Sequence, residues 1–243
     1  MTNFFLSVII PAYNEEKYLP DTLIDINDFL LNKGFSYEII VVNDGSTDKT
    51  SEVVKKYEKK IKNLVLIDNK DNRGKGFAVR QGMLKAKGRL RLFLDADNSA
   101  SIDQFQKMLF YFEEEKYDIV IGSRYVKGAK LEPPQMWYRK FLSRIGNFII
   151  QIFFLSDIKD TQCGFKCFTA EVAEKVFSIS KIDGFGFDFE ILVLSKKLGY
   201  KIKEIPIRWV NSPESKVNFK SYFLVFLDVL RLRWWLWFKK YNL

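Results

Sequence analysis

Apolar and polar positions form alternating blocks along the first half of the chain, and the blocks differ in period. Short, nearly continuous apolar runs such as FFLSVIIP and YEIIVVN are typical of strands buried on both faces. Between them, apolar residues recur every three or four positions, as at Leu19, Leu23, Ile26 and Leu30, which is typical of an amphipathic helix. Strands that alternate with helices predict an α/β fold with a mostly parallel sheet, whose ligand lies beyond the carboxyl ends of the strands.

The second half of the chain has a different pattern. We expect an amphipathic helix over residues 135–155, where an apolar stripe begins at Trp137. The segment that follows residue 218 mixes Trp, Phe and Leu with Arg and Lys. We expect a single domain with three parts, residues 1–128, 129–218 and 219–243.

Composition narrows the chemistry that the chain can perform. Its 243 residues carry 39 Lys and Arg against 30 Asp and Glu, so the net charge is +9, which suits an anionic partner or simply a solvated surface. There is no histidine, which excludes Ser-His-Asp catalysis, imidazole bases and His-ligated zinc. Two cysteines are too few for a four-thiolate zinc site. Any metal binding or proton transfer therefore depends on carboxylates.

We expect neither a secretion signal nor a membrane-spanning helix. The opening MTNFFLSVII leads directly into a predicted strand without a basic segment or a small-residue cleavage site. The longest apolar pieces are either short, as in FIIQIFFL, or interrupted by charges, as in YFLVFLDVLRLRWWLWF.

Two aspartates follow a predicted buried strand in LRLFLDADNS. Asp95 and Asp97 repel each other unless a cation lies between them, and paired carboxylates are the ligands that Mg²⁺ and Mn²⁺ prefer. Such a pair in isolation is more often part of a solvated turn, but its position at the end of a strand favours a metal site. The nearby RGKGFA matches neither the P-loop nor the dinucleotide-binding fingerprint.

Six motifs in this order resemble glycosyltransferase family 2: SVIIPAYNEE, VVNDGSTDKT, NRGKGFAVRQGM, DADNS, GSR and DTQCGFKCF. The resemblance covers essentially the whole chain and is closest to the polyprenyl-phosphate glycosyltransferases. It implies the nucleotide-sugar transferase fold of type A, with amphipathic interface helices in the C-terminal half. The family usually has Asp-Asp-Gly-Ser where this chain has Asn43 before Asp44.

The resemblance also implies roles for particular residues. The donor nucleotide sugar is expected to contact Pro11, Ala12, Tyr13, Glu15, Asp44, Gly74, Lys75, Asp95 and Lys216. Mg²⁺ or Mn²⁺ is expected at Asp95, Asp97 and Ser99. The catalytic set is expected to comprise Asp97 and three residues that hold the acceptor phosphate, Arg124, Arg139 and Ser143. Asp188 and Glu190 match an acidic stretch of the family, and no role is assigned to them.

The implied function is inverting, metal-dependent transfer of a hexose from a nucleotide diphosphate sugar to a polyprenyl or dolichyl phosphate. DTQCGFK favours glucose from UDP-glucose over mannose from GDP-mannose. A processive synthase is disfavoured because Ile205 replaces the Gln of its Q-x-x-R-W signature. A non-catalytic basic module that binds a membrane or single-stranded nucleic acid is the alternative from another class, but the intact motifs predict no nucleic-acid partner.

Two segments predict contact with a membrane surface. The helix that begins near Trp137 and the stretch WWLWFKKYNL combine aromatic and aliphatic residues with Arg and Lys, which is typical of helices that lie in the bilayer interface. Each helix could instead pack on the other or at a dimer contact. A polyprenyl acceptor favours the interface, so we expect a peripheral, monotopic enzyme on the cytoplasmic face of a membrane.

Overall fold

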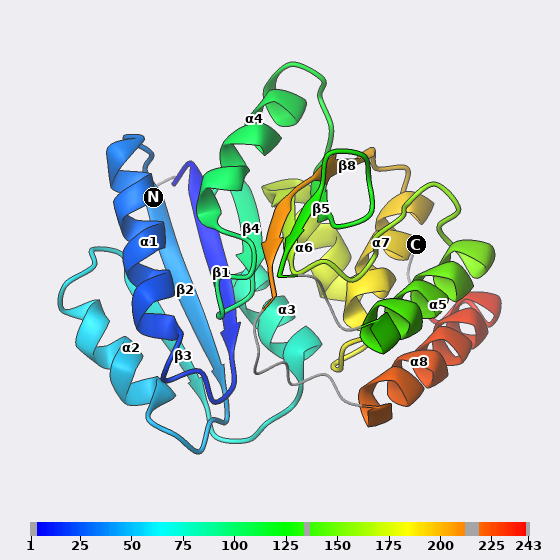
Figure 1. The fold of residues 1–243 in the computed structure, drawn as a ribbon, viewed down its shortest axis with the longest axis horizontal. Helices are drawn as coiled ribbons and strands as arrows, with labels where there is room; N and C mark the ends of the chain where they lie inside the picture. Colours follow the sequence, from blue (N-terminus) through cyan, green and yellow to red (C-terminus); the bar gives the residue numbers. More distant parts are fainter. Residues whose placement is uncertain (1–3, 134–136, 212–218, 242–243) are drawn as a thin grey trace.

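The centre of the molecule is a seven-stranded sheet (Figure 1), seen in a computed structural model that describes residues 4–133, 137–211 and 219–241. The strand order is β3-β2-β1-β4-β7-β5-β8. The strands are β1 (Leu6–Ala12), β2 (Tyr37–Asp44), β3 (Leu64–Asn69), β4 (Leu90–Leu94), β5 (Ile119–Ser123), β7 (Phe165–Thr169) and β8 (Ile202–Pro206). Only β7 is antiparallel to its neighbours, β4 and β5. The prediction of a mostly parallel sheet is confirmed.

Helices cover both faces of this sheet. The helices are α1 (Leu19–Asn32), α2 (Thr50–Glu58), α3 (Lys75–Lys85), α4 (Phe105–Glu113), α5 (Trp137–Phe153), α6 (Ala170–Ile179), α7 (Phe187–Lys197) and α8 (Phe219–Trp237), with a 3₁₀ turn, η1 (Ile102–Gln104), before α4. One face packs against α1, α2 and α4, and the other packs against α3, α6 and α7. Helices α5 and α8 lie side by side outside the second layer (Figure 1).

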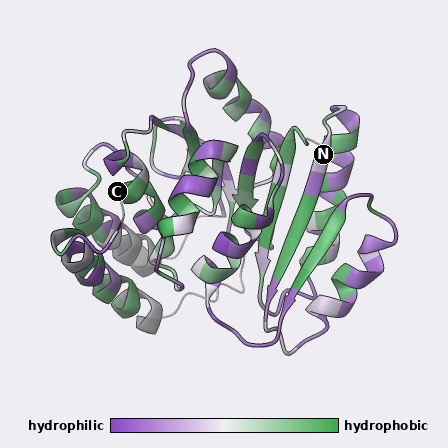
Figure 2. Cartoon of the chain, turned by 180° about the vertical axis from the view of Figure 1, so that it is seen from behind, coloured by the Kyte–Doolittle hydropathy of each residue, from purple (hydrophilic) through white to green (hydrophobic). Residues whose placement is uncertain are grey.

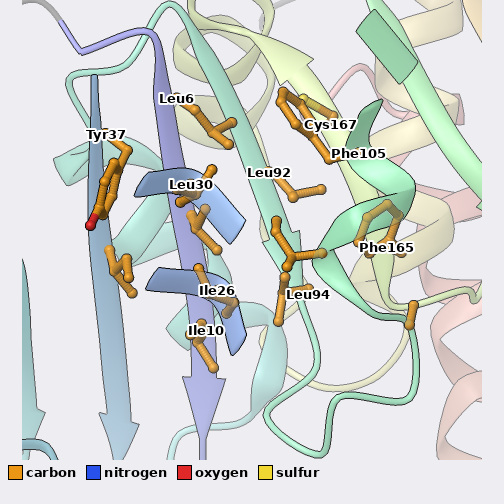
Figure 3. Close-up of a cluster of buried hydrophobic side chains, with 14 of the residues drawn as sticks. Leu6, Ile10, Ile26, Leu30, Tyr37, Leu92, Leu94, Phe105, Phe165 and Cys167 are labelled. Carbon is orange, nitrogen blue, oxygen red and sulfur yellow. The ribbon is translucent and has the colours of Figure 1, made fainter. Parts of the chain in front are cut away.

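Alternating side chains of the central strands explain these two layers. Leu6 and Ile10 of β1 point toward Ile26 and Leu30 of α1 (Figure 3), and all four are fully buried. Ile9, between them in β1, belongs instead to the cluster beneath α3. Each such side chain contributes about 2 kcal/mol by leaving water, so both faces of the strands must be covered.

Strand β7 joins the two halves of the chain in one sheet. It pairs with β4 on one side and β5 on the other, so its first residues meet the last residues of β4. Phe165 pairs with Leu94, the residue immediately before Asp95. A second, short parallel sheet consists of β6 (Lys130–Glu132) and β9 (Arg208–Val210).

Hydropathy along the chain separates the sheet from the helices. The strands at the centre are strongly hydrophobic, whereas the helices mix hydrophobic and hydrophilic positions (Figure 2). None of the helices within the described ranges has the length and apolarity that crossing a bilayer requires.

Candidate active site

The two aspartates of the sequence motif lie in the loop that follows β4. The carboxylate of Asp97 accepts the backbone N–H of Ser99 at 3.0 Å and a hydrogen bond from the Ser99 side chain. Burial and the negative charge of Asp95 raise the pKa of Asp97 above its usual value. The two carboxylates are therefore close enough to repel each other, as predicted from the sequence.

Lys75, the first residue of α3, faces the same loop. Its ammonium group lies 2.6 Å from a carboxylate oxygen of Asp95. Burial alone would lower the pKa of Lys75, but the negative charges of Asp95 and Asp188 outweigh it and raise that pKa above its usual value. Lys75 therefore remains a cation among three acidic side chains.

Asp188 and Lys166 extend this series of charges into the protein. They form a buried ion pair between the start of α7 and β7. Lys166 also donates to the backbone carbonyl of Cys163 at 2.6 Å. Burial raises the pKa of Asp188 despite the nearby charges of Lys166 and Lys75. Negative and positive groups thus alternate from Asp95 through Lys75 and Asp188 to Lys166.

Gly164, immediately before β7, makes room for Asp95. A Cβ atom at this position would overlap the Asp95 carboxylate. The close approach follows from the pairing of β7 with β4, which brings the two loops together at one edge of the sheet. Only glycine fits here without moving the aspartate.

The acidic loop has the donor atoms that a hard cation requires, although it does not enclose one. Carboxylate and hydroxyl oxygens of Asp95, Asp97 and Ser99 are of the type that Mg²⁺ and Mn²⁺ bind. Across residues 4–133, 137–211 and 219–241, no cluster of three or more acidic or cysteine side chains forms a metal cage. The residues therefore fit a cation that shares its ligands with a substrate, as phosphate-bound Mg²⁺ does.

Loops after β1, β2 and β3 form the neighbouring part of this edge. Pro11 and Ala12 end β1, and Tyr13, which is 37% exposed, follows them. The backbone N–H of Glu15 donates to the Thr50 hydroxyl at 2.8 Å. These four predicted donor-site residues thus lie at the end of β1 and in the loop after it, and Glu15 joins that loop to the start of α2.

Asp44, at the end of β2, is buried and holds the loop that precedes α3. Its carboxylate accepts the backbone N–H groups of Arg73 at 3.0 Å and Gly74 at 2.8 Å. Gly74 has a φ of 111°, which favours glycine. Asp44 therefore connects the end of β2 to the turn that carries Lys75. Its predicted contact with the donor nucleotide sugar stays a prediction.

Arg124 follows β5, and its guanidinium is paired within the protein. It donates two hydrogen bonds to Asp160, at 2.8 and 2.9 Å, and the Asp160 carboxylate is fully buried. The guanidinium also lies 5.1 Å from the centre of the Trp209 ring. Asp160 uses only part of the donor capacity of an arginine side chain.

Three predicted site residues cannot be placed. Lys216 lies outside the described residues. Arg139 and Ser143 belong to α5, but their side chains also lie outside the described part of the structure.

Asp160, Gly164 and Lys166 are site residues that the sequence reasoning did not single out, although all three lie in the motif DTQCGFKCF. One signal was available for Lys166. A lysine within an apolar strand is almost never fully buried unless it is paired, so its position predicts an acidic partner. Nothing in the sequence identified Asp188 as that partner.

Comparisons with known proteins show the family to which the chain belongs. Glycosyl transferase family 2 matches residues 7–177. Dolichyl-phosphate beta-glucosyltransferase ALG5A of Trichomonas vaginalis is 38% identical over 237 residues, which cover 94% of this chain and 72% of the relative. The dolichyl-phosphate beta-glucosyltransferase of Dictyostelium discoideum is 38% identical over 243 residues, covering 95% of this chain and 74% of the relative.

The fold is also shared with a solved glycosyltransferase. Glucosyl-3-phosphoglycerate synthase of Mycobacterium tuberculosis, crystallised with Mn²⁺, UDP and glucosyl-3-phosphoglycerate, superposes with a TM-score of 0.69 at 17% identity, covering 94% of this chain and 80% of that one. The predicted nucleotide-sugar transferase fold of type A is confirmed. The match to the family model, together with relatives that are 38% identical along nearly the whole chain, shows that the chain belongs to glycosyl transferase family 2.

Proposed function

We propose that this protein transfers glucose from UDP-glucose to dolichyl phosphate at a membrane surface, with inversion at the sugar carbon. The observation that carries the proposal is the Asp95–Asp97 loop facing Lys75 at the carboxyl end of β4. The names of the relatives, dolichyl-phosphate beta-glucosyltransferases, support the sugar and the acceptor. They favour glucose over the mannose alternative and an enzyme over a non-catalytic module.

The donor binds, on this proposal, across residues 1–128, with the nucleotide beside Pro11, Ala12, Tyr13, Glu15 and Asp44. The fold neighbour that contains Mn²⁺ and UDP supports a divalent cation, Mg²⁺ or Mn²⁺, at Asp95, Asp97 and Ser99. When bound, that cation neutralises the charge that develops on the departing diphosphate.

Lys75 also neutralises charge on the diphosphate, and it does so without a metal. Its raised pKa keeps the ammonium group charged at neutral pH. A permanent cation beside the acidic loop attracts phosphate oxygens and offsets the repulsion between Asp95 and the donor. Gly74 and Lys75 therefore hold the diphosphate, and Lys216 is proposed to contribute from a later loop.

The acceptor requires no strong general base, because a lipid phosphate is already ionised at neutral pH. Transfer then depends on positioning and on stabilising charge. Arg124 is held in place by Asp160 with N–H groups to spare for the acceptor phosphate. Arg139 and Ser143 are proposed to complete the acceptor site in residues 129–218. Attack opposite the leaving diphosphate inverts the sugar carbon, and the absence of histidine is no obstacle.

Helices α5 and α8 support docking on a membrane. Both expose large apolar side chains, among them Phe148 of α5, which is 61% exposed, and Trp237 of α8, which is 75% exposed. The helices pack on each other, as one alternative predicted, yet each leaves an apolar face uncovered. Exposed aromatic residues beside Arg and Lys suit the bilayer interface. We propose that the enzyme is peripheral, on the cytoplasmic face, where residues 219–243 contribute the contact.

A transfer assay tests the proposal directly. Radiolabelled UDP-glucose or GDP-mannose is offered with dolichyl phosphate and Mn²⁺, and the product is extracted into organic solvent. We expect labelled lipid from UDP-glucose alone, with an inverted anomeric carbon by NMR. Asp97→Ala is expected to abolish transfer, whereas Asp103→Ala, at an exposed acidic position in η1, is not. Labelled lipid from GDP-mannose alone would contradict the choice of sugar, and no labelled lipid from either donor would contradict the enzymatic function.

A further inference from the structure

The segment 180–186, between α6 and α7, supports the turn at which α3 begins. The backbone carbonyl of Asp183 accepts the N–H of Phe77 at 3.1 Å, and the Asp183 carboxylate pairs with Arg80. A Cβ atom on Gly74 would lie 2.5 Å from the Asp183 carbonyl oxygen. This segment therefore sets the position of the turn that carries Lys75.

Glu190 of α7 fixes the position of segment 180–186. Its two carboxylate oxygens accept the backbone N–H groups of Lys181 at 2.7 Å and Ile182 at 2.9 Å. One of them also accepts the hydroxyl of Tyr241 at 2.5 Å. Glu190 is fully buried, and burial raises its pKa despite these three donors. The Glu190 carboxylate thus fixes the backbone positions of residues 181 and 182.

Tyr241 brings the part of the chain beyond α8 into the same network. Tyr241 is 5% exposed, and its ring packs edge-on against Trp235 of α8. The ammonium of Lys181 reaches the backbone carbonyl of Lys240. Farther back in α8, the carboxylate of Asp228 accepts a hydrogen bond from the backbone of Gly186. Helix α8 and the residues that follow it therefore contact segment 180–186 at both ends of that segment.

We propose that Glu190 and Tyr241 are positioning residues for the donor site: they hold segment 180–186 against the Gly74–Lys75 turn and thereby connect α8 to the bound diphosphate. The inference rests on the proposed function, because it assumes that this turn contacts the donor. Neither residue lies in the acidic loop, and the hydrogen bonds described above join neither of them to Arg124. Their effect is therefore on donor binding and leaves the chemistry of a bound donor intact.

Two mild substitutions test this connection. Tyr241→Phe removes one donor from the Glu190 carboxylate and keeps the packing of the ring. Glu190→Gln keeps one acceptor oxygen but replaces the other with an NH₂ group, which cannot accept a backbone N–H. We expect each variant to raise KM for UDP-glucose about fivefold, because only part of the free energy of one charge-assisted hydrogen bond is transmitted to the donor site, while kcat and KM for dolichyl phosphate stay within about twofold. The affinity for UDP in Mn²⁺, measured by calorimetry, is expected to fall by the same factor.

The controls are a tyrosine and a glutamate of α2. Tyr57→Phe removes a hydroxyl remote from the site, and Glu58→Gln alters a carboxylate that accepts only the Leu66 N–H among its described contacts. Both are expected to keep the wild-type donor KM. If Tyr241→Phe and Glu190→Gln lower thermal stability but leave donor KM and UDP affinity unchanged, the residues are merely structural and the inference is wrong.

A ligand-free measurement separates this inference from the proposed function. Amide hydrogen exchange at residues 73–78 is expected to be faster in Tyr241→Phe than in the wild type, because the turn loses support. If the wild type neither binds UDP nor uses UDP-glucose while exchange accelerates as expected, the proposed donor is wrong and the positioning network stands. Unchanged exchange in this turn would overturn the network itself.

Discussion

At the scale of single residues, Asp95 is placed by three neighbours, and two of them, Lys75 and Gly164, are distant from it in sequence. Lys75 neutralises it, Gly164 leaves it space, and Asp97 repels it. The Asp95–Asp97 pair was recognisable because both residues follow one strand. The contributions of Lys75 and Gly164 were not, because they depend on the approach of α3 and β7 to the end of β4. Local spacing carries no information about such approaches.

Replacing Gly164 with alanine tests whether the space beside Asp95 matters. The added Cβ overlaps the Asp95 carboxylate, so the side chain must move away from its position beside Lys75 and Asp97. We expect kcat to fall about a hundredfold, the effect of misplacing a catalytic group by about 1 Å. Binding of Mn²⁺ in the presence of UDP, followed by electron paramagnetic resonance, is expected to weaken as well.

The matched control is Gly146→Ala in α5, where a Cβ atom would meet its nearest neighbour, the Gln162 side chain, only at 4.0 Å. This variant is expected to retain Mn²⁺ binding. Wild-type Mn²⁺ affinity in Gly164→Ala would show that the acidic loop tolerates the methyl group and that Asp95 does not depend on this glycine.

At the scale of elements, the segment before β7 connects several parts of the fold. The N–H groups of Lys159 and Asp160 donate to Glu204 of β8, at 3.0 and 2.8 Å. The N–H and hydroxyl of Thr161 donate to Asn147 of α5, at 3.0 and 2.8 Å. Asp160 adds its ion pair with Arg124 at the end of β5. Helix α5 is thus fastened to the sheet through this segment.

The buried Asp160–Arg124 pair makes stability depend on pH. Burial alone would raise the pKa of Asp160, but the charge and hydrogen bonds of Arg124 lower it below its usual value. A carboxyl group whose pKa is lower in the folded state stabilises the protein above its unfolded pKa, about 4, and this contribution is lost as the pH falls through the folded pKa. Asp160→Asn is therefore expected to cost about 3 kcal/mol at neutral pH and progressively less below about pH 4.

Urea unfolding followed by circular dichroism between neutral and acidic pH measures this difference. Asp157→Asn is the control, since Asp157 pairs with Lys196 at the surface and its loss is expected to cost less than about 1 kcal/mol. A constant difference between wild type and Asp160→Asn across the pH range would contradict ionic stabilisation.

At the scale of the whole molecule, the sequence predicted the helices and strands whose own residues show a regular pattern of apolar positions. Buried runs and helical stripes indicated β1, β2, β4, α1 and α5, because each depends on the period of its own residues. The antiparallel β7 and helix α6 were not predicted as such. β7 pairs with β4 and β5, two strands that come from the first half of the chain. Pairing between segments so far apart produces no periodic pattern in the sequence. For the same reason the buried partners of Arg124 and Lys166 appeared only in the structure.

On the proposed function, the apolar faces of α5 and α8 together make the contact with the membrane. Phe148 and Trp237 are among their most exposed apolar side chains, and removing two such groups from the interface costs about 2 kcal/mol or more. We expect Phe148→Ser combined with Trp237→Ser to lower the partition coefficient for phosphatidylcholine–phosphatidylglycerol vesicles at least about tenfold, measured by co-sedimentation. Leu31→Ser combined with Phe110→Ser removes comparably exposed residues from α1 and α4, at 61% and 53% exposure, and is expected to bind like the wild type. Equal losses in both double variants would mean that general surface hydrophobicity, rather than the α5–α8 face, holds the protein on the vesicles.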